Sequence, residues 1–268
     1  MEYIEKIATL TCPERIHTLK EEMLAEPRYA TIEQARIITK TYQQNEDKPR
    51  CIQRALALKA ALEEMTIRIE PDERIVGNRT PGVRGGVVFP ETGASWVAKE
   101  FESLPTRPQD RFQIRQEEVE EFRNQILPYW KGRSLEDQVR QAVGPQVDAI
   151  AKVVKINQKD HSQGHICPNT KKWLALGPSG IRQQALEHLA DAQGKQKDFY
   201  ESIVLVMEGA CRFMERYAEL AQELYEKTGK ENLLEVSKVC QKLSISALTP
   251  KSGWHSVPAA FVSRLWSI

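Results

Sequence analysis

Long apolar runs are absent from this sequence of 268 residues, and so are paired cysteines and a strong net charge. No run approaches the roughly 18 apolar residues that a membrane span requires, and the charged amino terminus lacks the apolar core of a signal peptide. A net charge of +1 argues against a nucleic-acid-binding protein, which would need a basic patch or stripe. Five dispersed cysteines without a CxxC pair indicate reduced thiols. We therefore expect a cytoplasmic protein without a membrane or nucleic-acid partner.

Helical periodicity dominates what is present. Three helices are predicted in the first 65 residues, and Pro27 ends the first of them. The sequence TIEQ at residues 31–34 predicts a capping box, in which the Thr31 hydroxyl accepts an orphan N–H and Gln34 reaches back. Between residues 199 and 224, apolar side chains alternate steps of four and three. This pattern predicts one helix of about 30 residues lying on a protein core, in preference to a coiled-coil seam.

Residues 66–91 differ from their surroundings, because they hold β-branched residues, four glycines and three prolines. The apolar pairs at 67 and 69 and at 75 and 76 predict short strands, and the glycines and prolines predict turns. Helices are expected to resume near residue 92, with Pro128 ending or kinking one of them. The predicted fold is therefore mainly α, with a few short strands around residues 66–90.

The loop INQKDHSQGHICPNTKKW (156–173) holds the densest group of chemically capable side chains. His161 and His165 are spaced i, i+4 and Cys167 follows, which is a possible zinc-ligand set. Gly164 and the proline at 168 make a regular helix doubtful there, and no second cluster supplies further ligands. Alternatively, Asp160 could orient an imidazole for acid–base or substrate-binding work. A hydrogen-bonded structural loop histidine is the third possibility. On local evidence alone it is the favoured interpretation, and the metal site is the least favoured.

The glycine-rich stretch GNRTPGVRGG offers backbone N–H groups that could cradle an anion. It matches neither the P-loop pattern nor the dinucleotide-binding pattern. Arg79 and Arg84 could hold a carboxylate or a phosphate, but a structural or solvated ion-pair role is the favoured interpretation.

Several collinear stretches between about residues 14 and 242 resemble the glycyl radical enzymes of the pyruvate formate-lyase-like group, especially the dehydratase branch. The matching stretches are ERIHTLKEEMLAEPRYATIEQARIITKTYQQNEDKP, RALALKAALEEMTIRIEPDERIVGNRTP, FPE, PTRPQDRFQI, LPYWKGRS, NQKDHSQGHICPN and RYAELAQEL. No single motif is decisive, and the resemblance rests on their order and number.

The resemblance implies a fold and a chemistry. It implies the helix-rich amino-terminal portion of a ten-stranded α/β barrel. The family stores a radical on a carboxy-terminal glycine and passes it to a loop cysteine. It then performs C–O or C–C lyase or acyl-transfer chemistry on small substrates in anaerobic metabolism. An S-adenosylmethionine iron–sulfur activating enzyme installs the radical, so no cofactor is expected to be bound by this chain.

The sequence departs from the family in what it lacks. Neither the G-C-V-E loop with the thiyl cysteine nor the R-V-A-G-Y radical motif is present. From Ser244 to Ile268 there is no Asp or Glu, and the resemblance decays there. We therefore expect an incomplete pyruvate formate-lyase-like domain at 1–243 and a divergent tail at 244–268, from a truncated or frame-disrupted gene. Whether the chain is an enzyme stays open, and alone it is not expected to be catalytic.

The resemblance also ranks the loop residues. It implies that His165 contacts a substrate hydroxyl, with Asp160 and Asn169 as weaker candidates, and that no metal is held. A small-molecule substrate is then a partner only of the full-length family. The alternative is a helical interaction protein that docks on a full-length paralogue or a separately encoded remainder, and a homo-oligomer is also possible.

Overall fold

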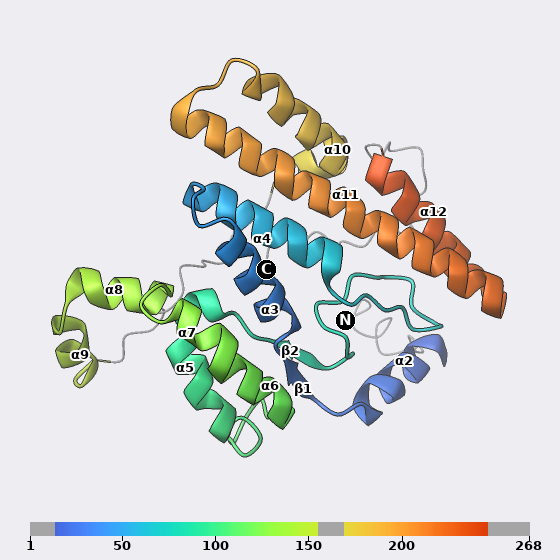
Figure 1. Ribbon diagram of the computed structural model, residues 1–268. Coiled ribbons are helices and arrows are strands. Elements are labelled where there is room, and N and C mark those ends of the chain that lie inside the picture. Colours follow the sequence, from blue (N-terminus) through green and yellow to red (C-terminus); the bar gives the residue numbers. More distant parts are fainter. Residues whose placement is uncertain (1–13, 155–168, 246–268) are drawn as a thin grey trace, which may run out of the picture.

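The computed structural model describes residues 14–154 and 169–245, and these are mainly helical (Figure 1). The helices are α2 (Glu14–Ala25), α3 (Glu33–Gln44), α4 (Arg50–Glu64), α5 (Pro90–Ser103), α6 (Gln116–Glu121), α7 (Leu127–Trp130), α8 (Leu135–Val143), α9 (Gln146–Ala151), α10 (Thr170–Leu189), α11 (Gly194–Thr228) and α12 (Glu231–Ile245). A π-helical stretch, η1 (Phe122–Ile126), joins α6 to α7. The predicted helix-rich class with few short strands is confirmed for the described residues.

The long helix α11 is the axis of one half of the fold. Its 35 residues confirm the helix predicted from the apolar stripe, and Gly229 ends it in the left-handed conformation with φ 69°. Figure 1 shows α4, α10 and α12 lying along it. At the crossing with α4, a Cβ added to Gly209 would come within 2.9 Å of the Lys59 Cα. A glycine is therefore required for the two helix backbones to approach this closely.

Two buried clusters form the core. One lies among α3, α5 and the α6–α7 segment and contains Trp130 and Phe122, and the other lies among α4, α11 and α12 and contains Tyr217 and Leu62. Trp130 is 2% exposed, and its Nε1 donates to the Thr39 hydroxyl at 2.8 Å. The buried polar atom is thus satisfied, as a buried indole requires.

The only strands in the described residues are β1 (Tyr29–Thr31) and β2 (Gly85–Val87), which pair in parallel with Ala30 opposite Gly86. The strands predicted at 67–69 and 75–76 do not form. Side chains satisfy backbone groups of that segment instead, since the Asn78 carboxamide accepts from the Arg68 N–H at 2.9 Å.

The predicted capping box is also wrong. The Thr31 hydroxyl accepts from the Glu33 N–H at 3.2 Å, but Gln34 turns into the core, where its amide donates to the Arg79 carbonyl at 2.8 Å. The side chain that reaches the Ile32 N–H is Glu118 of α6, at 3.2 Å. A carboxylate from a distant segment therefore takes the role that was assigned to the local glutamine.

Pro128 lies at the start of α7, directly after the π-helical stretch. Proline supplies no N–H for the preceding turn, and a π-helical turn is one way for a helix to pass such a break. None of the described helices is long and apolar enough to cross a membrane.

Candidate functional site

The predicted substrate loop lies mostly outside the described residues. Asp160 and His165 fall there, together with His161 and Cys167 of the metal hypothesis. Asn169, the remaining candidate, is exposed and caps α10, because its Oδ1 accepts from the Lys172 N–H at 3.0 Å. This contact gives Asn169 a structural role and leaves its amide nitrogen as a donor. Within the described ranges, no three His, Cys, Asp or Glu side chains gather as a metal site would require.

The helix that follows the loop is held by an ion cluster. Arg182 of α10 donates to Glu208 of α11 at 3.0 and 3.2 Å, and Lys59 of α4 donates to the same carboxylate at 2.8 Å. Partial burial alone would raise the pKa of Glu208, but the hydrogen bonds from Lys59 and Arg182 lower it below its usual value. One partly exposed carboxylate therefore joins α4, α10 and α11, and it holds α10 at a point beyond its kink at Gly177.

A cavity of about 350 Å³ lies beside β1 and β2, at the glycine-rich stretch. Tyr29 and Thr31 of β1, Arg84 of the loop, and Arg115 and Glu118 near the start of α6 line it. Arg84 donates to the carbonyls of Leu24 and Glu26, each at 3.3 Å. This contact agrees with the structural interpretation of Arg84. The two carboxylates among the lining residues, those of Glu26 and Glu118, do not favour an anion site.

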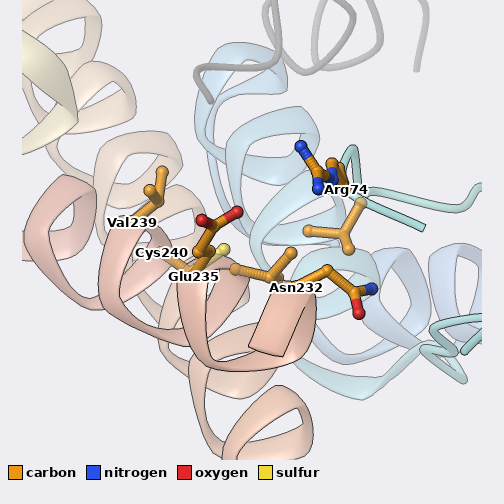
Figure 2. Close-up of a pocket in the computed structure, with 7 residues that line it drawn as sticks. Arg74, Asn232, Glu235, Val239 and Cys240 are labelled. Atoms are coloured by element: carbon orange, nitrogen blue, oxygen red, sulfur yellow. The ribbon is translucent and has the colours of Figure 1, made fainter. Parts of the chain in front are cut away.

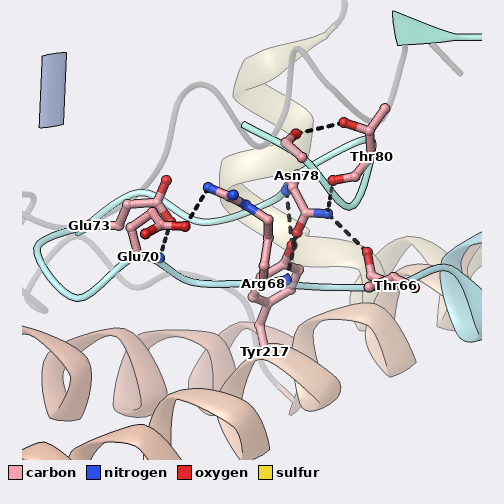
Figure 3. Close-up of polar contacts among 8 residues, drawn as sticks. Thr66, Arg68, Glu70, Glu73, Asn78, Thr80 and Tyr217 are labelled. Atoms are coloured by element: carbon pink, nitrogen blue, oxygen red, sulfur yellow. Dashed lines mark hydrogen bonds and ion pairs between the residues drawn. The ribbon is translucent and has the colours of Figure 1, made fainter. Parts of the chain in front are cut away.

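Asn78 is the centre of a polar network that joins the 66–80 loop to α11 (Figure 3). Its side-chain amide donates to the carbonyls of Thr66 at 2.9 Å and Thr80 at 2.7 Å. Its backbone N–H donates to the Tyr217 hydroxyl at 2.9 Å, and that hydroxyl donates to the Asn78 Oδ1. With the Arg68 N–H, the carboxamide is saturated with hydrogen bonds. Asn78 therefore closes the loop onto the helix and has no spare group for a ligand.

Arg216 and Tyr217, in the RYAELAQEL stretch, act as a pair of anchors. The Arg216 guanidinium donates to the carbonyls of Leu62 at 2.7 Å and Met65 at 2.6 Å, which lie at the carboxyl end of α4. A cation there satisfies carbonyls that the helix leaves unpaired. Burial raises the pKa of Tyr217 well above its usual range, so the hydroxyl stays protonated and able to donate.

The LPYWKGRS stretch forms a second anchor. Besides the Trp130 contact with α3, Arg133 pairs with Glu46 and lies 4.6 Å from the Tyr129 ring centroid. Ser134 caps α8, because its hydroxyl accepts from the Asp137 N–H at 3.3 Å, and the same hydroxyl donates to the Asp137 Oδ2 at 2.7 Å. These residues, like Arg216 and Tyr217, lie in stretches that carry the family resemblance, and their spacing in the sequence does not predict their structural roles.

A small hollow beside α12 lies among Arg74, Asn232, Glu235, Val239 and Cys240 (Figure 2). Its volume is about 10 Å³, which is room for one water molecule. Burial raises the pKa of the Cys240 thiol to about 12, which keeps it protonated and unreactive. The hollow is therefore neither a substrate site nor a nucleophile site.

The comparisons with known proteins agree with the resemblance seen in the sequence. A family model described as pyruvate formate lyase-like matches residues 8–247. The chain is 27% identical to (2S)-3-sulfopropanediol dehydratase of Klebsiella oxytoca, over 91% of this chain and 31% of that enzyme. It is 26% identical to trans-4-hydroxy-L-proline dehydratase of Clostridioides difficile, over 85% of this chain and 30% of that enzyme.

Among solved structures, the fold is similar to the glycerol-bound form of the B12-independent glycerol dehydratase from Clostridium butyricum. The TM-score is 0.83 at 30% sequence identity, covering 89% of this chain and 32% of that one. The chain thus spans about a third of the length of the relatives that it matches.

Proposed function

Because this chain belongs to the pyruvate formate lyase-like family, we propose that it forms the helix-rich amino-terminal portion of a glycyl radical dehydratase or lyase. The supporting observation is the similarity to the glycerol-bound glycerol dehydratase, with a TM-score of 0.83 over 89% of this chain. In this proposal the described helices form one side of a ten-stranded α/β barrel that the rest of the enzyme completes.

The proposed substrate is a small molecule with a hydroxyl group next to the carbon that loses hydrogen. The named relatives are dehydratases of a sulfopropanediol, a hydroxyproline and glycerol, all of which carry hydroxyl groups. His165 hydrogen-bonds the departing hydroxyl and Asp160 supports it. Asn169 contributes its free amide N–H groups, since its Oδ1 is occupied by the Lys172 N–H.

The radical chemistry itself belongs to residues that this sequence does not contain. Neither G-C-V-E nor R-V-A-G-Y occurs in it, so the isolated chain forms no glycyl radical and binds no cofactor. A separate S-adenosylmethionine iron–sulfur activating enzyme installs the radical in a complete enzyme. Incubation of the isolated chain with such an activating enzyme, followed by electron paramagnetic resonance, is expected to show no glycyl radical signal.

The role of His165 is tested in a chimera. Residues 14–243 replace the corresponding part of the Clostridium butyricum glycerol dehydratase, and the variants His165→Ala and His161→Ala are compared. Loss of a hydrogen-bonding acid–base group costs about 100-fold or more in turnover, so His165→Ala is expected to lose activity to that extent. His161→Ala, four residues away in the same loop, keeps it. Retention of the glycyl radical signal shows that the variant barrel is intact, and full activity of His165→Ala would refute the assignment.

A second candidate function is a helical interaction protein that docks on a full-length paralogue or a separately encoded remainder. Large apolar side chains on separate elements favour it, since Leu24 is 53% exposed, Trp96 48% and Phe199 56%. Such a protein would purify as a stable stoichiometric complex with its partner, whereas a chain without a partner would aggregate through these side chains.

A further inference from the structure

A surface cavity of about 120 Å³, called here the α4 cavity, lies at the amino end of α4. Its lining includes Tyr42 of α3, Arg50 and Gln53 of α4, Tyr129 of α7 and Arg133 of the turn after α7. The volume has room for several water molecules, or for one ion of the size of phosphate or acetate. The α4 cavity can therefore hold a small ligand, and none of its lining residues belongs to the loop at 156–173.

The walls of the α4 cavity are fixed by buried contacts. Gln53 is 7% exposed, and its amide donates to the carbonyls of Glu46 at 3.3 Å and Lys48 at 2.7 Å. These two bonds hold the turn between α3 and α4 in place. The Tyr42 ring packs edge-on against the buried Trp130 ring, with the centroids 5.0 Å apart. The groups that face the cavity are thus positioned by the fold before any ligand arrives, which lowers the entropic cost of binding.

The Tyr42 hydroxyl is a polar group without a partner in this frame. Tyr42 is 8% exposed, yet its hydroxyl makes no hydrogen bond with any described residue, Glu91 of α5 included. The hydroxyl interacts electrostatically with Arg50 and Tyr129, which both line the α4 cavity, so it faces the cavity. Burial raises the pKa of Tyr42, which keeps the hydroxyl protonated and able to donate. Buried polar groups are nearly always paired, so this donor indicates an occupant of the cavity that accepts hydrogen bonds.

The charge around the α4 cavity is positive. Arg50 is exposed and makes no hydrogen bond or ion pair with a described residue, whereas Arg133 is paired with Glu46. The helix α4 begins after Pro49 without a side-chain cap. The first N–H groups of a helix have no acceptor within it, and they attract negative charge. Burial raises the pKa of Glu91, which favours its neutral form and limits the negative charge beside Tyr42. An anion is therefore the ligand that this lining favours.

We propose that the α4 cavity binds a small oxoanion, a phosphate or a carboxylate group, between the Arg50 guanidinium, the Tyr42 hydroxyl and the amino end of α4. An oxoanion accepts hydrogen bonds from all three, and a guanidinium matches its geometry. The bound ion joins α3 to α4 and stabilises the folded chain, because the unfolded chain has no such site. This proposal does not depend on the proposed function, since it uses no residue of the substrate loop.

The test is isothermal titration calorimetry of the full chain with sodium phosphate and, separately, with sodium acetate, at an ionic strength held constant with sodium chloride. Saturable binding of at least one ion is expected, and the tighter ion identifies the preferred group. Arg50→Gln is expected to lower the affinity about tenfold or more, because a charge-assisted hydrogen bond is lost. Tyr42→Phe keeps the ring and is expected to lower the affinity about threefold or more.

Lys48→Gln is the matched control. It removes the same charge from an exposed position two residues before Arg50 that does not line the α4 cavity, so the affinity is expected to stay within about twofold of the parent. Circular dichroism shows that each variant is folded. Thermal unfolding gives a second readout, since phosphate or acetate raises the midpoint of the parent and of Lys48→Gln but not that of Arg50→Gln.

Two kinds of result would overturn this proposal. If neither ion binds saturably, the α4 cavity holds water only. If Arg50→Gln binds as tightly as the parent, or Lys48→Gln loses as much affinity as Arg50→Gln, the ion is attracted by the general charge of the surface. A failure of the His165→Ala test in the chimera has no bearing on these measurements, so the two proposals can fail independently.

Discussion

Replacing Tyr217 by phenylalanine removes a single hydroxyl from the fully buried junction between α11 and the 66–80 loop. The Asn78 N–H then loses its acceptor, and the Asn78 Oδ1 keeps only the Arg68 N–H. A buried donor left unpaired costs about 1–3 kcal/mol. We therefore expect the free energy of unfolding to fall by about 2 kcal/mol, because the ring itself still fills its place in the core.

Urea unfolding followed by circular dichroism measures this loss. With a denaturant slope of about 2–3 kcal/mol/M, the midpoint falls by about 0.5–1 M. Tyr225→Phe is the control, since it lies on the same helix and its hydroxyl makes no hydrogen bond with any described residue. A change below about 0.5 kcal/mol for Tyr217→Phe, or an equal change for Tyr225→Phe, would refute the network as a source of stability.

The same pair of proteins gives a pH signature. Burial raises the folded-state pKa of Tyr217, so its contribution is complete below the unfolded-state pKa of about 10 and is lost as the pH rises above it. The stability difference between the parent and Tyr217→Phe is thus expected to shrink above about pH 10. A difference that stays constant to pH 11 would contradict the burial of an ionisable hydroxyl at this junction.

Three further predictions concern the helix contacts and the thiols. Gly209→Ala forces α11 away from the Lys59 backbone, and it is expected to lower the free energy of unfolding by about 1–3 kcal/mol in the same urea assay. A stabilised variant would show that the two helix backbones have room for a Cβ at this position. Glu208→Gln is expected to cost about 0.5–1 kcal/mol at pH 7. The folded-state pKa of Glu208 lies below its usual 4.5. The difference in the free energy of unfolding between the parent and Glu208→Gln is therefore expected to disappear as the pH falls through that lowered value. A difference that persists at pH 2 would refute the ion cluster as its source. In iodoacetamide labelling at pH 8 read by peptide mass spectrometry, exposed Cys51 reacts in the native chain, whereas Cys240, with a pKa of about 12, reacts only after urea is added. Equal rates would place Cys240 outside the core.

Regular helices could be predicted from the sequence because their signal is local. The stripe from residue 199 to 224 fixes the face of α11 that carries buried Phe213 and Tyr217. The same stripe includes Phe199, which is 56% exposed. Periodicity predicts which side of a helix is apolar, but it does not predict how far along that side a neighbour extends.

The irregular segment at 66–84 could not be predicted by the same reasoning. Its β-branched residues match a strand pattern, but a side chain ten positions away satisfies the Arg68 N–H. Likewise, Gln34 looks like a local capping residue and instead joins a carbonyl 45 positions away. The wrong strand prediction and the wrong capping prediction have the same cause. The hydrogen-bond partner of a polar side chain depends on the tertiary fold, and it produces no periodic pattern in the sequence.

For the candidate site, sequence reasoning named three residues, and two of them, Asp160 and His165, lie outside the described residues. Asn169 is the exception, and its capping contact shows that one residue can be explained by the start of a helix alone. Trp130 and Tyr217, which lie in stretches that carry the family resemblance, are buried anchors. The resemblance therefore predicts fold more strongly than it predicts chemistry.

Because the buried anchors and the proposed substrate residue are different side chains, the fold and the function can be tested separately. Tyr217 touches the core and no candidate substrate residue among those described, so its loss lowers stability in the isolated chain and leaves the substrate preference of a chimera unchanged. His165 is proposed to touch substrate, so its loss lowers turnover while the glycyl radical signal remains. If Tyr217→Phe changed the preference between glycerol and 1,2-propanediol, the loop at 66–80 would have to communicate with the substrate. The anchoring role derived from Asn78 would then be incomplete.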